Sequence, residues 1–198
     1  MAWEAYCDDC IPIGAAVTGP AGEVLTRGRN HIYNDWDRRR SVRGIVLEHA
    51  EMDALRKLDY GAVDPHACDL YTTTEPCPMC LGGFYMSGLR RLHYASRDPY
   101  AGSVDLLGKT WYLSHKPIQT FGPTDPGLEV LILALSIEQD AFPNGGVLPE
   151  HHIYRRWADV LPRGIELGVE LSRTGELQRM KSAGVPVGEV FDGLFALV

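Results

Sequence analysis

The feature that most constrains this chain is a set of metal-type ligands at short, fixed spacings. His49 stands two residues before Glu51, and Cys77 and Cys80 lie in a Pro-Cys-Pro-Met-Cys run. One imidazole and two thiolates fill three corners of a zinc tetrahedron, and an open fourth corner is typical of a catalytic zinc site. Because the ligands come from two separate segments, the fold must bring both segments to one point.

The size and composition are those of a globular protein without a membrane span. The 198 residues fit one compact domain, or one domain with a helical appendage. No apolar run approaches the ~20 residues of a transmembrane helix. The first ten residues lack the basic and apolar regions of a signal peptide. We therefore expect a cytoplasmic protein whose cysteines are thiols or ligands.

The net charge of −7 argues against a protein that mainly grips nucleic acid, because such affinity comes from many Lys and Arg contacts with phosphates. A small uncharged substrate fits this charge better. The basic run Arg38–Arg40, with Arg43, precedes His49 and is open to two interpretations. It could contact a phosphate near the site, or it could be a solvated loop balanced by nearby aspartates.

The first half of the chain alternates strand and helix patterns. Residues 11–17 and 23–29 are strand-like and flank a Gly-Pro-Ala-Gly segment, which predicts a hairpin. Residues 45–58 carry apolar side chains mostly at three- and four-residue steps and predict an amphipathic helix. Residues 69–74 and 91–96 predict two further strands. This alternation indicates an α/β fold with parallel pairing across the helices.

Prolines and glycines punctuate the rest of the chain. Pro76 and Pro78 open a helical segment that ends at Gly88, and residues 127–139 predict another helix before a Pro-Asn-Gly-Gly break. Helical patches follow from His152 onward. We therefore divide the chain into a core of residues 1–145 and a helical extension of residues 146–198, packed on that core.

The spacing of His49 and Glu51 places both residues at a helix end. A helix advances about 100° per residue, so residues two apart point to nearly opposite sides of its flank. The two side chains can serve one metal site only if the metal lies off the first turn. Cys77 and Cys80 likewise stand at the start of the second helix, where free backbone N–H groups favour thiolates.

Two thiolates make the chemistry depend on Glu51. They cancel the charge of the zinc ion and leave it a weaker Lewis acid than a zinc held by three histidines. An adjacent base then becomes necessary. Glu51 can take a proton from water and return protons to a ring nitrogen and a leaving amine, which describes hydrolytic deamination.

These residues carry a family resemblance. His-Ala-Glu at 49–51, followed by Leu-Tyr-Thr-Thr-Thr-Glu-Pro-Cys-Pro-Met-Cys-Leu-Gly-Gly at 70–83, resembles the zinc-dependent cytidine deaminase superfamily. With Ser87-Gly88 and Arg-Asp-Pro at 97–99, it is more similar to the guanine deaminase and tRNA adenosine deaminase branch. The resemblance covers about residues 3–110. It implies a three-layer α/β/α fold with a central mixed five-stranded sheet plus C-terminal helices, one catalytic zinc per chain and a homodimer.

The resemblance also implies roles for individual residues. Zinc would be held by His49, Cys77 and Cys80, and Glu51 would transfer protons. Asn30, at the end of a Gly-Arg-Asn motif, would hydrogen-bond the substrate ring, and the backbone at Ala50 would help to seat it. The segment 34–44 is longer than this branch leads us to expect, so we expect a remodelled loop over the pocket.

Other uses of the cysteines stay open. Cys7 and Cys10 form a second Cys-x-x-Cys, which with Cys77 and Cys80 could make a structural four-thiolate zinc site. That arrangement would join distant segments and leave His49 without a role. Cys7 and Cys10 alone could be a redox pair, but we favour ordinary residues at a helix end.

We expect a deaminase of a free nucleobase or nucleoside, with purines of the guanine or guanosine type preferred and nucleic acid an unlikely partner. The first rival is a tRNA adenosine deaminase, and the second acts on cytosine or cytidine. A tRNA enzyme would need a basic face assembled from Arg38–Arg40, Arg43, Arg90–Arg91 and Arg155–Arg156. A non-catalytic zinc-stabilised binding module is a rival of another class, and the presence of Glu51 argues against it. The sequence leaves the role of residues 115–198 open.

Overall fold

The computed structural model describes residues 1–33 and 46–198. These residues form two compact units, Met1–Pro123 and Thr124–Val198, which are described separately. The basic run Arg38–Arg40, Arg43 and the whole segment 34–44 lie outside the described residues.

A mixed five-stranded sheet with the order β2-β1-β3-β4-β5 forms the centre of the first unit. The strands are β1 (Gly14–Thr18), β2 (Val24–Arg29), β3 (Asp69–Thr74), β4 (Arg91–Ser96) and β5 (Gln119–Phe121). β1 pairs antiparallel with β2 and β3, whereas β3 with β4 and β4 with β5 pair parallel. The expected mixed sheet is confirmed. Its fifth strand is three residues long and exposed throughout, so it leaves no periodic pattern to detect.

The predicted hairpin is formed by β1 and β2. Its turn is closed by the N–H of Gly19, which donates to the carbonyl of Glu23 at 2.9 Å, and Gly22 has a left-handed φ of 81°. β1 begins at Gly14, later than predicted, because the N–H of Ile13 donates back to the carbonyl of Ile11 at 2.7 Å. That local turn excludes an extended chain at this point.

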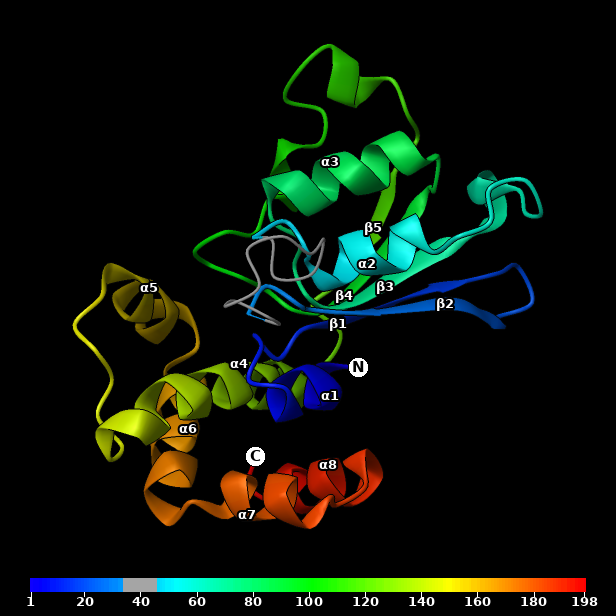
Figure 1. Cartoon of the computed structure of the whole chain (residues 1–198). Helices are drawn as coiled ribbons and strands as arrows, with labels where there is room; N and C mark the ends of the chain where they lie inside the picture. The colour runs from blue at the N-terminus through cyan, green and yellow to red at the C-terminus, as the bar shows by residue number, and fades with distance from the viewer. Residues whose placement is uncertain (34–45) are drawn as a thin grey trace. The chain divides into compact units, whose positions relative to one another are not determined.

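Helices cover both faces of the sheet, as expected for three layers. α2 (Ala50–Arg56) and α3 (Pro78–Ser87) lie on one face, and α1 (Ala2–Cys7) lies on the other (Figure 1). Val17, Leu70 and Leu92 are partners across β1, β3 and β4 and belong to a core shared with α2 and α3. The core therefore holds the first turns of α2 and α3 against the sheet.

The helix predicted over residues 45–58 is shorter than expected and begins at Ala50. His49 is its N-cap, with an extended backbone (φ −73°, ψ 156°). Residue 45 is outside the described residues, and Val46 and Leu47 are exposed and not helical. The spacing of Val46 and Leu47 continues the apolar pattern of the helix. Apolar side chains from Ala50 onward are buried in the core, whereas Val46 and Leu47 are exposed. His49 consequently lies at the very end of the helix.

The second unit is entirely helical in its regular structure. Its helices are α4 (Pro126–Ala141), α5 (His152–Val160), α6 (Pro162–Thr174), α7 (Glu176–Ala183) and α8 (Val187–Phe195). α4 confirms the helix predicted over 127–139, and left-handed Gly145 and Gly146 form the predicted break. Gly164 and Gly168 of α6 let α4 approach closely, since a Cβ at Gly168 would lie 2.5 Å from the Cβ of Ile137.

The change between the compact units falls at Pro123 and Thr124. α4 therefore groups with the helices that follow it. The division into residues 1–145 and 146–198, and the packing of the extension on the core, stay predictions. In the part of the chain that the structure describes, we find no helix with the length and apolar character needed to cross a membrane.

Gly28 of β2 lets α2 lie directly on the sheet. A Cβ at this position would lie 2.1 Å from the carbonyl oxygen of Ala50 and 2.4 Å from the backbone nitrogen of Ala54. The hydroxyl of Thr26 also donates to the carbonyl of Ala54 at 2.9 Å. This backbone-to-backbone approach sets the distance between the sheet and the first turn of α2.

Gly28→Ala should lower the free energy of unfolding by about 3 kcal/mol, because the added methyl group meets backbone atoms that cannot rotate away. Gly82→Ala in α3 is the control: no heavy atom of the described residues comes within the contact range of the added Cβ. It should be neutral, or stabilising by up to about 1 kcal/mol. Urea denaturation measures both variants, and equal stability would contradict the close approach.

Candidate metal centre

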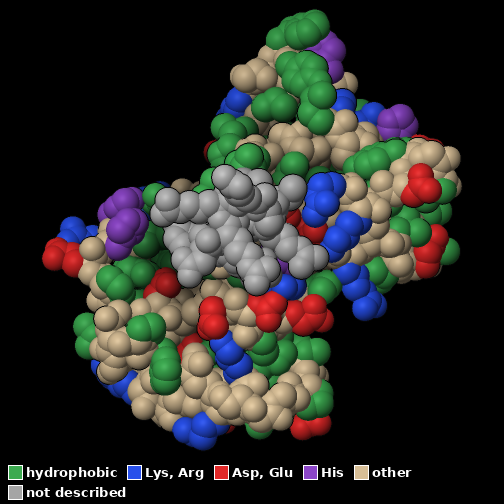
Figure 2. Space-filling model, in the orientation of Figure 1, with side chains coloured by type: hydrophobic (Ala, Val, Ile, Leu, Met, Phe, Trp, Pro, Cys, Tyr) green, Lys and Arg blue, Asp and Glu red, His purple; other side chains and the backbone are tan. Residues whose placement is uncertain are grey.

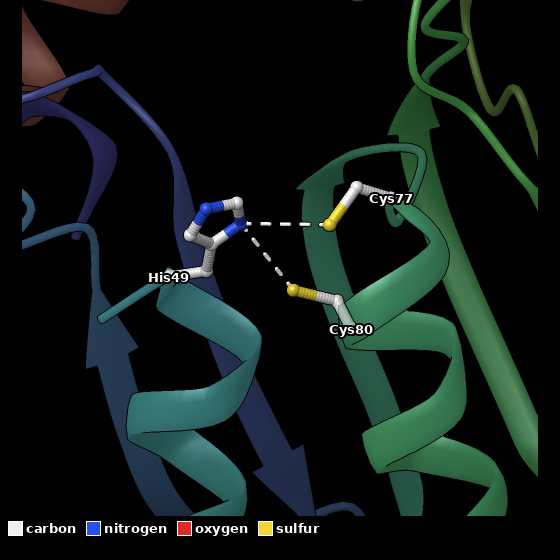
Figure 3. Close-up of side chains that lie close together, drawn as sticks. All are labelled: His49, Cys77 and Cys80. Carbon is white, nitrogen blue, oxygen red and sulfur yellow. Dashed lines mark hydrogen bonds between the residues drawn. The ribbon is translucent and has the colours of Figure 1, made fainter. Parts of the chain in front are cut away.

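His49, Cys77 and Cys80 come together in the structure as the sequence predicted. The Nδ1 atom of His49 lies 3.6 Å from the Sγ of Cys77 and 3.5 Å from the Sγ of Cys80. Figure 3 shows the imidazole, at the start of α2, facing both sulfur atoms at the start of α3. One ligand atom from each residue lies within 4.8 Å of the others. The three residues are therefore positioned to bind one metal ion.

The local fold explains this convergence. His49 is the N-cap of α2 and Cys77 the N-cap of α3, while Cys80 lies in the first turn of α3. The first N–H groups of a helix have no partner within the helix, and they favour a negative charge nearby. Thiolates are therefore stabilised where the two helices begin.

Proton sharing in the cluster prepares one thiolate. Hydrogen bonding by Cys80 and then by His49 lowers the pKa of Cys77 to about 4, although burial opposes the shift. The interaction with Cys77, followed by burial, raises the pKa of Cys80, and Cys77 likewise raises the pKa of His49. Without a metal, Cys77 is thus a thiolate near neutral pH, and metal binding must displace the remaining protons.

The donor set fits zinc. One imidazole nitrogen and two sulfurs are ligands that zinc prefers, and this number of protein ligands leaves a coordination position for water or substrate. Within residues 1–33 and 46–198, His49, Cys77 and Cys80 form the group of ligand-type side chains that could hold an ion. Cys7 and Cys10 are not members of it, so the geometry does not support the four-thiolate alternative.

Glu51 lies beside the cluster and is not one of its ligand-type residues. Only 4% of its surface is exposed, and its Oε1 accepts a hydrogen bond from the hydroxyl of Thr72 at 3.2 Å. Burial raises the pKa of Glu51, and smaller contributions from its own backbone N–H and from Cys80 oppose this shift. A buried carboxyl with a raised pKa is suited to accepting and returning protons near neutral pH.

Asn30 and Ala50 also lie in the buried part of this region. Asn30 directly follows β2, and only 1% of its surface is exposed. Its Oδ1 accepts the N–H of Ile32 at 3.1 Å, but its Nδ2 is buried and has no hydrogen-bond partner among the described residues. A buried donor without a partner is costly, which makes it a candidate ligand contact. Ala50, the first residue of α2, is fully buried.

Sequence reasoning missed three residues that support the site. Thr72 holds Glu51, and Asp53 is a buried carboxylate that joins β2 to α2. Glu75 accepts the N–H groups of Asp98 at 3.3 Å and Val104 at 3.2 Å, which holds the segment after β4. Strand alternation could have placed Thr72 on the helix-covered face, whereas the contacts of Asp53 and Glu75 depend on tertiary structure.

Comparison with known proteins agrees with this geometry. A family model described as "Cytidine and deoxycytidylate deaminase zinc-binding region" matches residues 1–96. The chain is 35% identical over 127 residues to a probable cytosine deaminase of Schizosaccharomyces pombe, which covers 57% of this chain and 70% of that protein. The chain belongs to the zinc-dependent cytidine deaminase superfamily.

Other relatives are named for different activities. The chain is 33% identical over 104 residues to guanine deaminase of Bacillus subtilis, covering 48% of this chain and 62% of that protein. It is 37% identical over 128 residues to tRNA(Ile)-lysidine synthase of Deinococcus deserti, covering 62% of this chain. That match spans only 22% of the length of the synthase. The activity of these whole proteins therefore does not transfer directly.

Solved structures share the deaminase fold. One comes from a study of A-to-I editing by tRNA deaminases at the wobble position, with a TM-score of 0.50 and 27% identity, covering 61% of this chain and 88% of that chain. Another is a mutant protein in complex with 8-azaguanine, with a TM-score of 0.50 and 25% identity, covering 65% and 72%. These similarities confirm the predicted fold class.

The zinc content of variants distinguishes residues that bind the metal from Glu51, the proposed base. His49→Ala and Cys80→Ser should weaken zinc binding by more than about 100-fold, since losing a ligand costs more than the roughly 10- to 100-fold effect of losing a group that only hydrogen-bonds to a ligand. Glu51→Gln and Thr72→Val should each retain about one zinc ion per chain. Elemental analysis after dialysis, with competition by a chromogenic chelator, measures this. Loss of zinc from Glu51→Gln would make Glu51 a ligand rather than a base.

The lowered pKa of Cys77 predicts how the charge of its thiol group changes with pH in protein from which a chelator has removed the metal. The thiolate of Cys77 should persist from neutral pH down to about 4 and be protonated below that value. Its absorbance at 240 nm should therefore titrate near pH 4. Cys77→Ser should remove this transition and Cys7→Ser should keep it. A transition only near the ordinary thiol pKa of about 8.5 would contradict the proton sharing.

Proposed function

We propose that this chain is a zinc-dependent hydrolytic deaminase of a free purine base or purine nucleoside, with guanine-type substrates preferred. One observation carries the proposal: the buried carboxyl of Glu51 lies beside a cluster of His49, Cys77 and Cys80 without being part of it. A structural metal site has no use for such a base. A site for water-dependent deamination requires one.

In this proposal His49, Cys77 and Cys80 hold the ion. Bound zinc supplies a Lewis acid that makes a water molecule more acidic. Glu51 accepts a proton from the attacking water and delivers protons to a ring nitrogen and to the leaving amino group. One water is consumed, the exocyclic bond between the ring carbon and the amino nitrogen breaks, a C–O bond forms at the same carbon and ammonia leaves. Thr72 orients Glu51 by donating to its Oε1.

Asn30 and Ala50 would position the ring. The buried Nδ2 of Asn30 has donors to offer, and a purine such as guanine presents ring and carbonyl acceptors. The backbone of Ala50, at the first position of α2, would seat the substrate beside Glu51. The similarity to guanine deaminase and the net charge of −7 support a small purine.

Adenosine deamination in tRNA is a second candidate, favoured by the similarity to a tRNA deaminase structure. Lys and Arg side chains gather over α2 on the face shown in Figure 2, and Arg27, Arg56 and Lys57 are exposed. Of the basic residues predicted for this role, however, Arg91 is paired with Asp69. Cytosine-type activity is a third candidate, supported by the relative from Schizosaccharomyces pombe. Homodimer assembly and a cytoplasmic location remain predictions.

The reaction is tested by ammonia release. Zinc-loaded protein should release ammonia from guanine or guanosine faster than from adenine, cytosine, their nucleosides or triazine analogues. Glu51→Gln should lower kcat by at least about 100-fold, because general acid–base catalysis contributes that much. It should keep its zinc.

Two outcomes would redirect the proposal. Formation of inosine in tRNA, with binding that weakens steeply as salt rises, would favour the tRNA candidate. An absence of turnover for every small molecule, with one zinc per chain, would contradict the small-molecule proposal.

A further inference from the structure

Asp53 is an aspartate that α2 buries beside the proposed site. Only 2% of its surface is exposed, and it is not one of the metal-type ligands. A buried carboxylate is unfavourable unless charges and hydrogen bonds surround it. Both carboxylate oxygens of Asp53 have such partners. The partners offset the cost of burying the charge and hold the side chain in one place.

The partners of Asp53 lie on both sides of Asn30. Its Oδ2 accepts from the backbone N–H of Arg29 at 3.3 Å and lies 3.3 Å from the Nε2 of His31. Asn30 is the residue between them. The N–H of Asn30 donates to the carbonyl of Ile13 at 3.0 Å. The segment that carries Asn30 is therefore held at the residue before it, at the residue itself and at the residue after it.

Asp53 belongs to the same first turns of α2 as the ligand His49. Its backbone N–H donates to the carbonyl of His49 at 2.9 Å. The N–H of His31 in turn donates to the carbonyl of Glu48 at 2.9 Å, so the chain after Asn30 also meets the chain before His49. One side chain thus links the end of β2 with the first turn of α2, where His49 and Glu51 lie.

The charges around Asp53 favour its ionised form. Burial raises the pKa of Asp53, but the hydrogen bond from Lys57 at 2.7 Å, the charge of Lys57 and the backbone N–H of Arg29 act with the other surrounding groups to leave the pKa below the usual value. Arg56 contacts the other oxygen at 3.1 Å. Burial and then Arg29 lower the pKa of His31, so its neutral ring can donate Nε2–H to the carboxylate. The carboxylate is therefore an acceptor for every one of these groups.

We propose that Asp53 is a positioning residue that aims the amide of Asn30 at the substrate relative to His49 and Glu51. This inference rests on the proposed function, because the role of Asn30 is part of it. The Nδ2 of Asn30 is buried without a partner among the described residues, while the Oδ1 of the same amide accepts the N–H of Ile32. The direction of Nδ2 therefore depends on how the backbone of residues 29–32 is held, and Asp53 contacts this segment at Arg29 and His31. The contacts of Asp53 with the neighbouring residues supply that direction.

The proposal predicts an effect on substrate binding more than on chemistry. Asp53→Asn keeps the shape of the side chain and removes its charge and one acceptor. It should raise KM for guanine about tenfold and change kcat by less than about threefold, since the amide of Asn30 contacts the substrate before and during reaction. Zinc content should stay at that of the wild type. Asp59→Asn is the control, an exposed aspartate of the segment after α2.

A double-mutant cycle shows whether Asp53 acts through Asn30. In an Asn30→Ala background, Asp53→Asn should raise KM no further, because the amide that it positions is already gone. A purely structural role would raise KM equally in both backgrounds, or would lower stability and zinc content together. Either of those results would overturn the inference.

The side-chain amide resonances of Asn30 provide a readout that needs no turnover. They are identified in a ¹⁵N spectrum by their loss in Asn30→Ala, and they should shift or broaden in Asp53→Asn but not in Asp59→Asn. If the wild type deaminates no member of the panel, the proposed function fails while this spectrum still decides the inference. Unchanged resonances in Asp53→Asn would overturn it.

Discussion

Two helices of the first unit begin at the same place, and the rest of the site depends on that convergence. The starts of α2 and α3 carry the positive ends of two helix dipoles, which would repel each other if nothing negative lay between them. The negative charge of a thiolate at Cys77 balances the positive ends of the two dipoles. The imidazole of His49 lies 3.6 Å from this sulfur and shares its charge through a hydrogen bond. The fold thereby favours thiolate ligands before any metal is considered.

Much of this arrangement could be predicted from the sequence because it rests on local rules. The spacing of His49 and Glu51 places them at a helix end, and Pro78 and Gly88 mark the limits of α3. The start of α2 was predicted too early because Val46 and Leu47 prolong an apolar spacing that the helix does not use. The short exposed strand β5 has no pattern of its own and forms only because β4 offers an edge.

The supporting residues could not be predicted for a different reason. In the sequence, Asp53 stands in an amphipathic helix, where a solvated position is the ordinary expectation for a carboxylate. Its burial results from the end of β2 lying over it, a contact between residues 24 apart. The Nδ2 of Asn30, which has no partner among the described residues, likewise results from packing, since nothing in the Gly-Arg-Asn motif specifies which donors lack partners. Metal ligands can be recognised from their spacing in the sequence, whereas the residues that position other site residues can be recognised only from the three-dimensional structure.

The contact at Gly28 has a consequence for how such a site can diversify. At Gly28 the strand and the helix approach each other mainly through backbone atoms, so any larger side chain at this position would push α2 away from the sheet. The position of α2, which carries His49 and Glu51, therefore tolerates little substitution at this contact. New substrate preferences must arise in segments free of this contact, and the chain can vary those segments without disturbing the reaction centre.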